Sequence, residues 1–272
     1  MSFFVKVCLF YLTVIGISSY LSLFERKLIG RIQWRFGARY CGKFGLLQPI
    51  ADGLKLFFKQ NSLYGHSFVS LFSCCLLLFA SLLQFAFLPL QQFSLLPSPY
   101  GLLYILMCHT LINFSELLIG ITSNSKYGII GGIRVVYKKF GSDLPFIMVL
   151  LCLYARYNSF DFNYIVAHFD WFVLFIIPCM FVISLINTNH IPFDFIEAES
   201  DIIAGSYTEY GGVLFGIIYL SDYLNVFFNG LFFSSLFLQK FWLGFGAVFY
   251  ISTVILIRAI LPRGLQIWLL FK

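Results

Sequence analysis

The chain has 272 residues, of which 60% are hydrophobic and only 11% are charged, and its mean hydropathy is +0.88. A soluble domain is usually about 45–50% apolar and about 25% charged, so this composition excludes a water-soluble globular protein and predicts that lipid surrounds the chain. The net charge of +6 does not indicate nucleic-acid binding, because the basic residues lie in short segments between apolar runs, where topology signals occur.

Seven apolar runs follow one another along the chain, and a bilayer-spanning helix needs roughly 20 mostly apolar residues. We therefore predict one all-α polytopic membrane domain over residues 1–272, with about seven transmembrane helices. The first run is too long for a signal-peptide core and lacks a cleavage site of small residues, so we expect it to be retained. The predicted spans are about 3–24, 67–90, 100–121, 144–157, 171–186, 212–236 and 241–260.

The loop charges predict the orientation of these spans. All Lys and Arg residues except Lys6, Arg156 and Lys240 fall on one side of the arrangement, and basic loops stay on the inner side. We expect the N-terminus outside and the two large loops, 25–66 and 187–211, inside. The first loop is basic, whereas the second has no Lys or Arg and goes against the usual bias. The acids of the second loop are Asp194, Glu197, Glu199, Asp201 and Glu209.

An amphipathic helix is predicted within the basic loop, where residues 45–59 read GLLQPIADGLKLFFK. Polar residues recur there at spacings of four, three and four, with apolar residues on the other side of the helix. The polar residues are Gln48, Asp52, Lys55 and Lys59. Such a helix is too polar to span a bilayer and would lie in the interface plane. Two interpretations stay open: a surface anchor, or a floor for an amphiphilic ligand that enters from lipid.

Several acidic residues fall within or beside the predicted spans. Asp222 lies about ten residues into the sixth span, where a carboxylate costs about 2.5–3.5 kcal/mol, so functional use is the default hypothesis. The alternative is a neutral acid hydrogen-bonded for packing, for example to Asn225. Glu116 lies near the inner end of the third span and Asp143 opens the fourth. A series of acids is what a proton relay requires, and the alternative is a solvated acidic face.

Signatures of a bound redox group are not found in the sequence. Of the four His residues only His109 lies clearly within a span, whereas a membrane b-type haem needs two facing His ligands. There is no GxGxxG, no Walker loop and no CxxC pair, so we expect neither a nucleotide, a flavin nor a metal on this chain. Any redox cofactor is expected in another subunit.

Five segments resemble subunit one of respiratory NADH dehydrogenase, complex I. They are collinear over nearly the whole chain, and GLLQPIAD together with PFDxxEAES is a highly specific combination. The segments are ERKLIGRIQWRFGARYCGKFGLLQPIADGLKLFFK (25–59), SNSKYGIIGGIRVV (123–136), NTNHIPFDFIEAESDIIAGSYTEYGG (187–212), SDYLN (221–225) and RAILPR (258–263).

The resemblance implies a membrane-arm component that helps to form the tunnel through which ubiquinone enters from lipid, and that begins the acidic axis coupling quinone reduction to proton pumping. FMN and iron–sulfur clusters would belong to partner subunits of the complex, and phospholipids would surround the helices. The expected quinone-tunnel residues are Arg26, Arg35, Gln48, Asp52, Lys55 and His190. The expected proton-relay residues are Glu116, Asp143, Glu197, Glu199, Asp201, Glu209, Asp222 and Tyr223.

Some positions depart from the family pattern. Asp143 and Asp222 stand where the family usually has Glu, which keeps the acid but shortens its reach. Asn187 also replaces a usual Glu, and His190 replaces a usual Arg, which weakens a presumed anchor of the acidic loop. The family usually continues into an eighth span, which residues 264–272 are too short to form.

Two other function classes stay open. A stand-alone transporter or channel would also use buried acids, although transporters usually show repeated halves, which we do not find. The related subunits of membrane hydrogenases and plastid plastoquinone reductases would share the fold. The 35 Phe residues indicate the T-rich coding bias that organelle genomes often have, and we expect the mitochondrial inner membrane.

Overall fold

The computed structural model describes residues 3–59, 67–89, 95–168, 172–189, 193, 205–237 and 243–270. Every regular element in this part of the chain is helical, as the composition predicts. The α-helices are α1 (Phe3–Ile32), α2 (Gln48–Phe58), α3 (Ser67–Ala86), α4 (Gly101–Thr122), α5 (Lys126–Tyr157), α6 (Phe162–Ala167), α7 (Phe172–Asn187), α9 (Gly212–Phe237) and α10 (Leu243–Leu270), and the short 3-10 turns are η1 (Lys43–Gly45) and η2 (Gly205–Tyr207).

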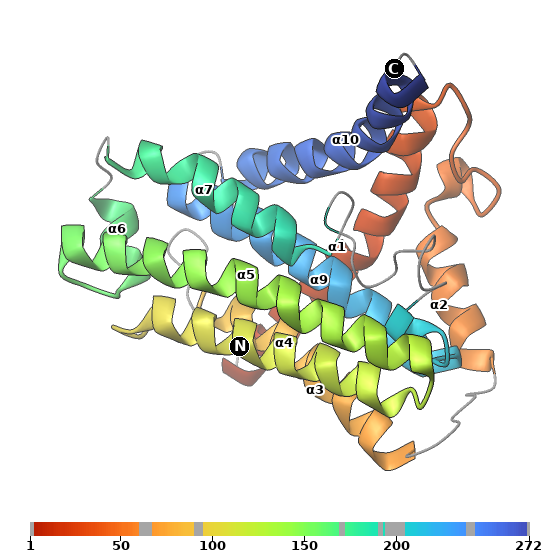
Figure 1. Ribbon diagram of the computed structural model, residues 1–272, viewed down its shortest axis with the longest axis horizontal. Helices are drawn as coiled ribbons and strands as arrows, with labels where there is room; N and C mark the ends of the chain where they lie inside the picture. The colour runs from red at the N-terminus through yellow and green to blue at the C-terminus, as the bar shows by residue number, and fades with distance from the viewer. Residues whose placement is uncertain are drawn as a thin grey trace.

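Five helices form a ring in which each packs against the next, in the order α3, α4, α5, α7 and α9. Helix α9 also contacts α1, α2, α6 and α10, so it is the central element of the fold. Figure 1 shows the ring helices running along the long axis, with α6 at the left end and α2 at the right end.

The lengths and compositions of the helices fit a multi-pass membrane protein. Within the described residues, four helices are long and apolar enough to cross a membrane, namely α1, α3, α4 and α9. Helices α7 and α10 contain shorter apolar stretches, and α5 is longer but carries charged residues in its first half. Large apolar side chains such as Leu12, Phe79 and Phe249 are exposed on the outer faces. The all-α membrane fold predicted from the sequence is thus confirmed.

Three helices extend well beyond the predicted spans, among them α10, which continues to Leu270 although the seventh span was predicted to end at residue 260. Helix α1 continues to Ile32 instead of ending at residue 24, because the charged residues that follow are good helix formers. It ends in a Schellman motif: the backbone N–H of Arg35 donates to the Gly30 carbonyl at 2.9 Å and that of Trp34 to the Arg31 carbonyl at 3.2 Å. Trp34 takes the left-handed position of this motif with a φ of 55°.

Helix α5 begins at Lys126, well before the fourth predicted span. Ser125 caps its first turn by accepting a hydrogen bond from the Gly128 N–H at 3.0 Å. Asn158 ends it in the left-handed conformation, with its N–H bonded to the Tyr154 carbonyl at 2.7 Å. One buried face runs through the whole helix at intervals of three and four residues. Its residues are Gly128, Gly131, Gly132, Val135, Lys138, Lys139, Ser142, Phe146, Val149, Leu150 and Leu153.

The backbones of α4 and α5 approach closely at a pair of glycines. A Cβ atom on Gly120 would lie 2.6 Å from the Cα atom of Gly132 and 3.0 Å from the Gly128 carbonyl oxygen. Helices in lipid gain little from the hydrophobic effect and associate through close packing of small residues. This contact therefore fixes the spacing of the two helices just beside their charged residues.

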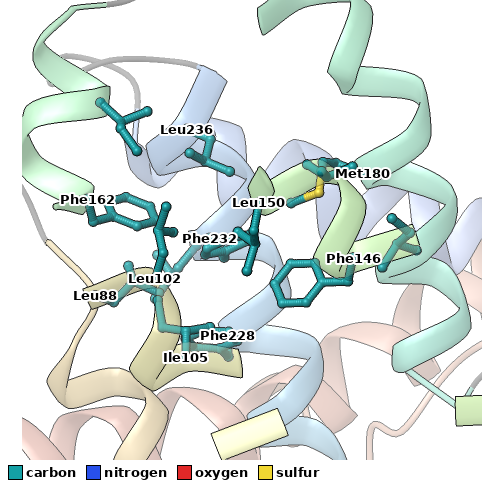
Figure 2. Close-up of a cluster of buried hydrophobic side chains, with 14 of the residues drawn as sticks. Leu88, Leu102, Ile105, Phe146, Leu150, Phe162, Met180, Phe228, Phe232 and Leu236 are labelled. Carbon is teal, nitrogen blue, oxygen red and sulfur yellow. The ribbon is translucent and has the colours of Figure 1, made fainter. Parts of the chain in front are cut away.

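The main apolar core fills the ring from its α6 end (Figure 2). Aromatic rings interlock there, for example Phe146 of α5 with Phe232 of α9, whose ring centroids are 6.1 Å apart. A second, smaller apolar cluster, which includes Leu77, Ile119 and Leu214, lies toward the η2 turn. The labelled side chains of the main core in Figure 2 are Leu88, Leu102, Ile105, Phe146, Leu150, Phe162, Met180, Phe228, Phe232 and Leu236.

Candidate functional site

The amphipathic helix α2 is joined to α1 by an ion pair. Nη1 of Arg26 donates to Oδ2 of Asp52 at 2.8 Å, and Nε2 of Gln48 donates to Oδ1 of Asp52 at 2.9 Å. Arg26 also interacts with the hydroxyl of Tyr219 on α9. Gln48 and Asp52, on the predicted polar side of α2, thus face α1, whereas Lys55 of the same side is exposed. Leu54, like other apolar residues on the far side, is also exposed.

A buried carboxylate lies next to this pair. Glu25 is only 5% exposed, and its two oxygens are bound by groups from two different helices. Tyr223 of α9 donates to Oε2 at 2.7 Å, and Arg258 of α10 forms an ion pair with Oε1. The hydroxyl of Tyr219 lies 3.1 Å from that of Tyr223, so the Arg26 and Glu25 groups form one continuous network. A buried charge is tolerated only when it is paired in this way.

A cavity of about 480 Å³ opens where α1 ends. Its size falls within the range of about 300–1,000 Å³ that is typical of small-molecule sites. The guanidinium of Arg39 lies 4.2 Å from the centre of the Phe36 ring, which is within the range of a cation–π interaction. The lining residues are Lys27, Arg31, Trp34, Arg35, Phe36, Gly37, Ala38, Arg39 and Phe44, so the predicted tunnel residue Arg35 lies in its wall.

A second charged cluster lies between α4 and α5. Glu116 and Lys139 are each 2% exposed, and Nζ of Lys139 is 3.5 Å from Oε1 of Glu116. Nδ2 of Asn189, just after α7, donates to the same oxygen at 3.2 Å. Nζ of Lys138 donates to Oδ1 of Asn189 at 2.5 Å and to the carbonyl of Phe193 at 3.1 Å. Opposite charges and an amide are thus brought together inside the protein.

The two other intramembrane acids have polar neighbours of their own. Oδ2 of Asp143 accepts a hydrogen bond from Nδ2 of Asn113 at 2.7 Å. Oδ2 of Asp222 accepts one from the hydroxyl of Tyr207 at 3.4 Å. The oxygen of Asn225, the expected packing partner of Asp222, accepts instead from Nε2 of Gln84 on α3 at 2.9 Å. Asp222 is therefore linked to the end of the acidic loop.

The last part of the acidic loop is fixed against α4. The buried hydroxyl of Tyr210 donates to the Ile119 carbonyl at 3.1 Å and lies 2.6 Å from Oγ1 of Thr122. Burial raises the pKa of Tyr210, so this hydroxyl stays protonated at neutral pH. Glu209 lies next to it, partly buried.

The structure places five of the predicted site residues in two groups. Arg26, Gln48, Asp52 and Tyr223 meet where α1, α2 and α9 pack together, while Glu116 lies between α4 and α5. Lys55 is exposed, one turn beyond Asp52 on α2. Four predicted residues lie outside the described part of the chain: His190, Glu197, Glu199 and Asp201.

Four charged residues of these networks were missed from the sequence: Glu25, Arg258, Lys138 and Lys139. Helix periodicity could have found two of them. Val14 and Ser18 are buried on α1, and Glu25 follows Ser18 at seven residues, which returns to the same face. Extending the apolar face of α5 back from Phe146 likewise reaches Lys139. Asn189 gives no such signal, because its partners are distant in sequence.

The known proteins that this chain resembles all belong to one family. A family model described as NADH dehydrogenase matches residues 5–268. NADH-ubiquinone oxidoreductase chain 1 of Paracentrotus lividus is 36% identical, and the match covers 86% of this chain and 74% of the relative. Chain 1 of Cyanidium caldarium is 33% identical, with 96% and 83% covered.

A bacterial relative gives the same result. An NADH-quinone oxidoreductase component of Dehalococcoides mccartyi (strain CBDB1) is 32% identical over 94% of this chain and 77% of its own. For chain 1 of Strongylocentrotus purpuratus, at 36% identity, the match spans 66% of the relative's length. A model match over nearly the whole chain, joined to these identities and to the helical membrane fold, means that this chain belongs to the NADH dehydrogenase family that comprises subunit 1 of complex I and its bacterial counterparts.

Proposed function

We propose that this chain forms the entry path for ubiquinone and the first part of the proton-coupling axis in a proton-pumping NADH:ubiquinone oxidoreductase. The observation that carries the proposal is the network at the meeting point of α1, α2 and α9. There an interfacial helix with an exposed apolar side is tied through Arg26 and Asp52 to a buried carboxylate, Glu25. An amphiphilic ligand needs such a boundary between lipid and buried polar groups.

The entry path is supported by the chemistry of the groups around it. The exposed apolar side of α2, including Ile50 and Phe57, suits an isoprenoid tail that arrives from lipid. The carbonyl oxygens of a quinone head group accept hydrogen bonds, and Arg35 in the cavity wall supplies donors. FMN and iron–sulfur clusters in partner subunits supply the electrons, and this chain guides and orients the acceptor.

The coupling axis is supported by the acids on the α2 side of the bundle. Reduction of a quinone to a quinol consumes two electrons and two protons, so it changes the local charge. Asp222 is linked through Tyr207 to the end of the acidic loop, and Glu116 is linked through Asn189 to its start. A charge change at the loop therefore reaches two separate acids inside the bundle.

The setting that fits these roles is the mitochondrial inner membrane, with the N-terminus toward the intermembrane space and the large loops toward the matrix. Nearly all basic residues then lie on the matrix side. Trp34, Phe36 and Tyr40 are among the most exposed side chains of the described residues, and the quinone-module subunits of the complex are the partners that would cover them.

Replacement of Asp222 tests the coupling axis. Asp222→Asn removes an ionisable group while keeping the shape of the side chain, so we expect NADH:ubiquinone turnover and proton pumping to fall strongly while NADH oxidation by ferricyanide is unchanged. Asp161→Asn is the matched control, because Asp161 caps α6 at the other end of the bundle and Asn caps as well as Asp. Normal pumping in the Asp222→Asn complex would remove Asp222 from the relay.

Replacement of Asp52 tests the entry path separately. Asp52→Asn abolishes the ion pair with Arg26, so we expect the KM for a short-chain ubiquinone to rise severalfold with ferricyanide reduction intact. The Asp161→Asn control again carries the same chemical change elsewhere. An unchanged KM would mean that the pair only anchors α2. Isolation of the chain without flavin and iron–sulfur subunits would instead favour the transporter class.

A further inference from the structure

Asn189, which follows α7 at the start of the acidic segment, residues 187–211, binds groups of opposite charge. Asn189 accepts a hydrogen bond from Nζ of Lys138 at 2.5 Å and donates one to Oε1 of Glu116 at 3.2 Å. Lys138 also donates to the carbonyl of Phe193 at 3.1 Å. A primary amide is suited to this position because it has both an acceptor oxygen and a donor nitrogen, whereas Lys and an ionised Asp each offer only one of these functions.

The backbone at Asn189 is also specific. Its φ is 56°, in the left-handed region that Asn and Gly accept more readily than other residues. The residues it binds are buried: Lys138 is 9% exposed and Glu116 is 2% exposed. Hydrogen bonds to charged groups are stronger than those between neutral groups, more so away from water. The hydrogen bonds of the Asn189 amide are therefore much stronger than those of an amide on the protein surface.

The other end of the segment returns to the same helices. Tyr210 donates to the Ile119 carbonyl at 3.1 Å, and Ile119 follows Glu116 by three residues on α4, which is about one turn. A Cβ atom on Gly131 of α5 would lie 2.8 Å from the backbone nitrogen of Ser206, so the η2 turn packs tightly on α5. Both ends of the acidic segment thus meet α4 and α5 near the Glu116–Lys139 pair.

We propose that Asn189 is a positioning residue that clamps the acidic segment to the buried Glu116–Lys139 ion pair. At Oε1 of Glu116 the Asn189 amide shares a carboxylate oxygen with Lys139, whose Nζ is 3.5 Å away. The position of the Asn189 side chain then decides whether this oxygen has one partner or two. At the far end the hydrogen bonds of Tyr210 go to Thr122 and to the Ile119 carbonyl, so of the described residues at the two ends only those at the start bind the charged groups of α4 and α5.

The clamp itself follows from these contacts, but its use in proton transfer rests on the proposed function. Two substitutions weaken it without straining the backbone. Asn189→Gly keeps the left-handed conformation and deletes both hydrogen bonds. Asn189→Asp keeps the acceptor for Lys138 but places a second carboxylate against Glu116. The double variant N189D/E116Q exchanges donor and acceptor across the contact, so it restores the hydrogen bond between positions 189 and 116.

Amide hydrogen exchange of the intact complex, followed in peptides that cover residues 187–211, measures the clamp directly. We expect Asn189→Gly and Asn189→Asp to speed exchange in these peptides about tenfold or more, the effect of losing hydrogen bonds to charged groups. N189D/E116Q should return the rate toward that of the unaltered chain. Asn158→Gly is the matched control, because Asn158 has the same left-handed backbone, with a φ of 53°, at the end of α5.

Two results would overturn the clamp: unchanged exchange in Asn189→Gly, or exchange in N189D/E116Q that remains as fast as in Asn189→Asp. Turnover of the Asn189→Gly complex separates this inference from the proposed function. With a functional relay, its kcat with ubiquinone falls while its KM stays the same. Faster exchange together with a normal kcat supports the clamp and counts against the relay.

Discussion

The close approach of α4 and α5 leads to a prediction that can be worked out from distances. In Gly120→Ala the new Cβ atom would lie 2.6 Å from the Cα atom of Gly132, whereas non-bonded carbon atoms prefer about 3.5–4.0 Å. The helices must therefore separate by roughly 1 Å. Overpacking of this kind costs about 1–3 kcal/mol, and the better helix propensity of Ala offsets about 1 kcal/mol of that.

The separation also acts on the nearby ion pair. Glu116 lies one turn before Gly120, and its 3.5 Å contact with Lys139 would stretch beyond the roughly 4 Å limit of an ion pair. The yield of intact complex on native gels and its thermal midpoint measure the outcome, and we expect the midpoint to fall by roughly 2–6 °C. Gly141→Ala is the matched control on α5, since nothing lies within 4 Å of its added Cβ atom. Equal midpoints for the two variants would refute this account of the packing.

Three further changes test individual contacts. Tyr223→Phe leaves one oxygen of buried Glu25 without its 2.7 Å donor, which should destabilise the chain by about 1–3 kcal/mol, seen as a lower thermal midpoint; an unchanged midpoint would contradict the network. Lys139→Met leaves Glu116 without its ion-pair partner, at a cost of about 3–5 kcal/mol, and K139M/E116Q should recover most of the lost yield. Trp34→Gly relieves the strain of a left-handed backbone at a residue with a side chain, about 1–2 kcal/mol, so the thermal midpoint should rise. The KM for ubiquinone should rise as well, because the Trp34 side chain forms part of the cavity wall.

The fold was largely accessible from the sequence because lipid imposes a simple rule on helix length and composition. The sixth predicted span, 212–236, and the amphipathic helix agree closely with α9 and α2. The fourth predicted span, 144–157, does not agree with α5, because hydropathy alone marks only the apolar half of that helix. Its polar half is helical for a different reason: glycines on its buried face allow α4 to pack against it.

The candidate site was only partly accessible. Arg26, Asp52 and Tyr223 are placed by resemblance, and the structure joins them through contacts that the resemblance alone does not give. Glu25 is adjacent to Arg26 but looked like part of a polar flank, since hydropathy cannot distinguish a charge in solvent from a charge paired across helices. Asn189 depends on partners more than 50 residues away, a relation that no local pattern contains.

The directions in which Glu25 and Arg26 point are fixed by the helix α1 that carries them. Its 30 residues correspond to about 45 Å, about 15 Å more than the hydrocarbon thickness of a bilayer, so one unbroken rod joins the lipid-embedded part to Glu25 and Arg26. Successive residues differ by about 100° around such a rod. Glu25 therefore reaches α9 and α10, whereas Arg26 reaches α2 and a different residue of α9. Inserting a single residue anywhere between Ser18 and Phe24 would turn both away from their partners at once, whereas inserting seven would restore their direction and change only their height.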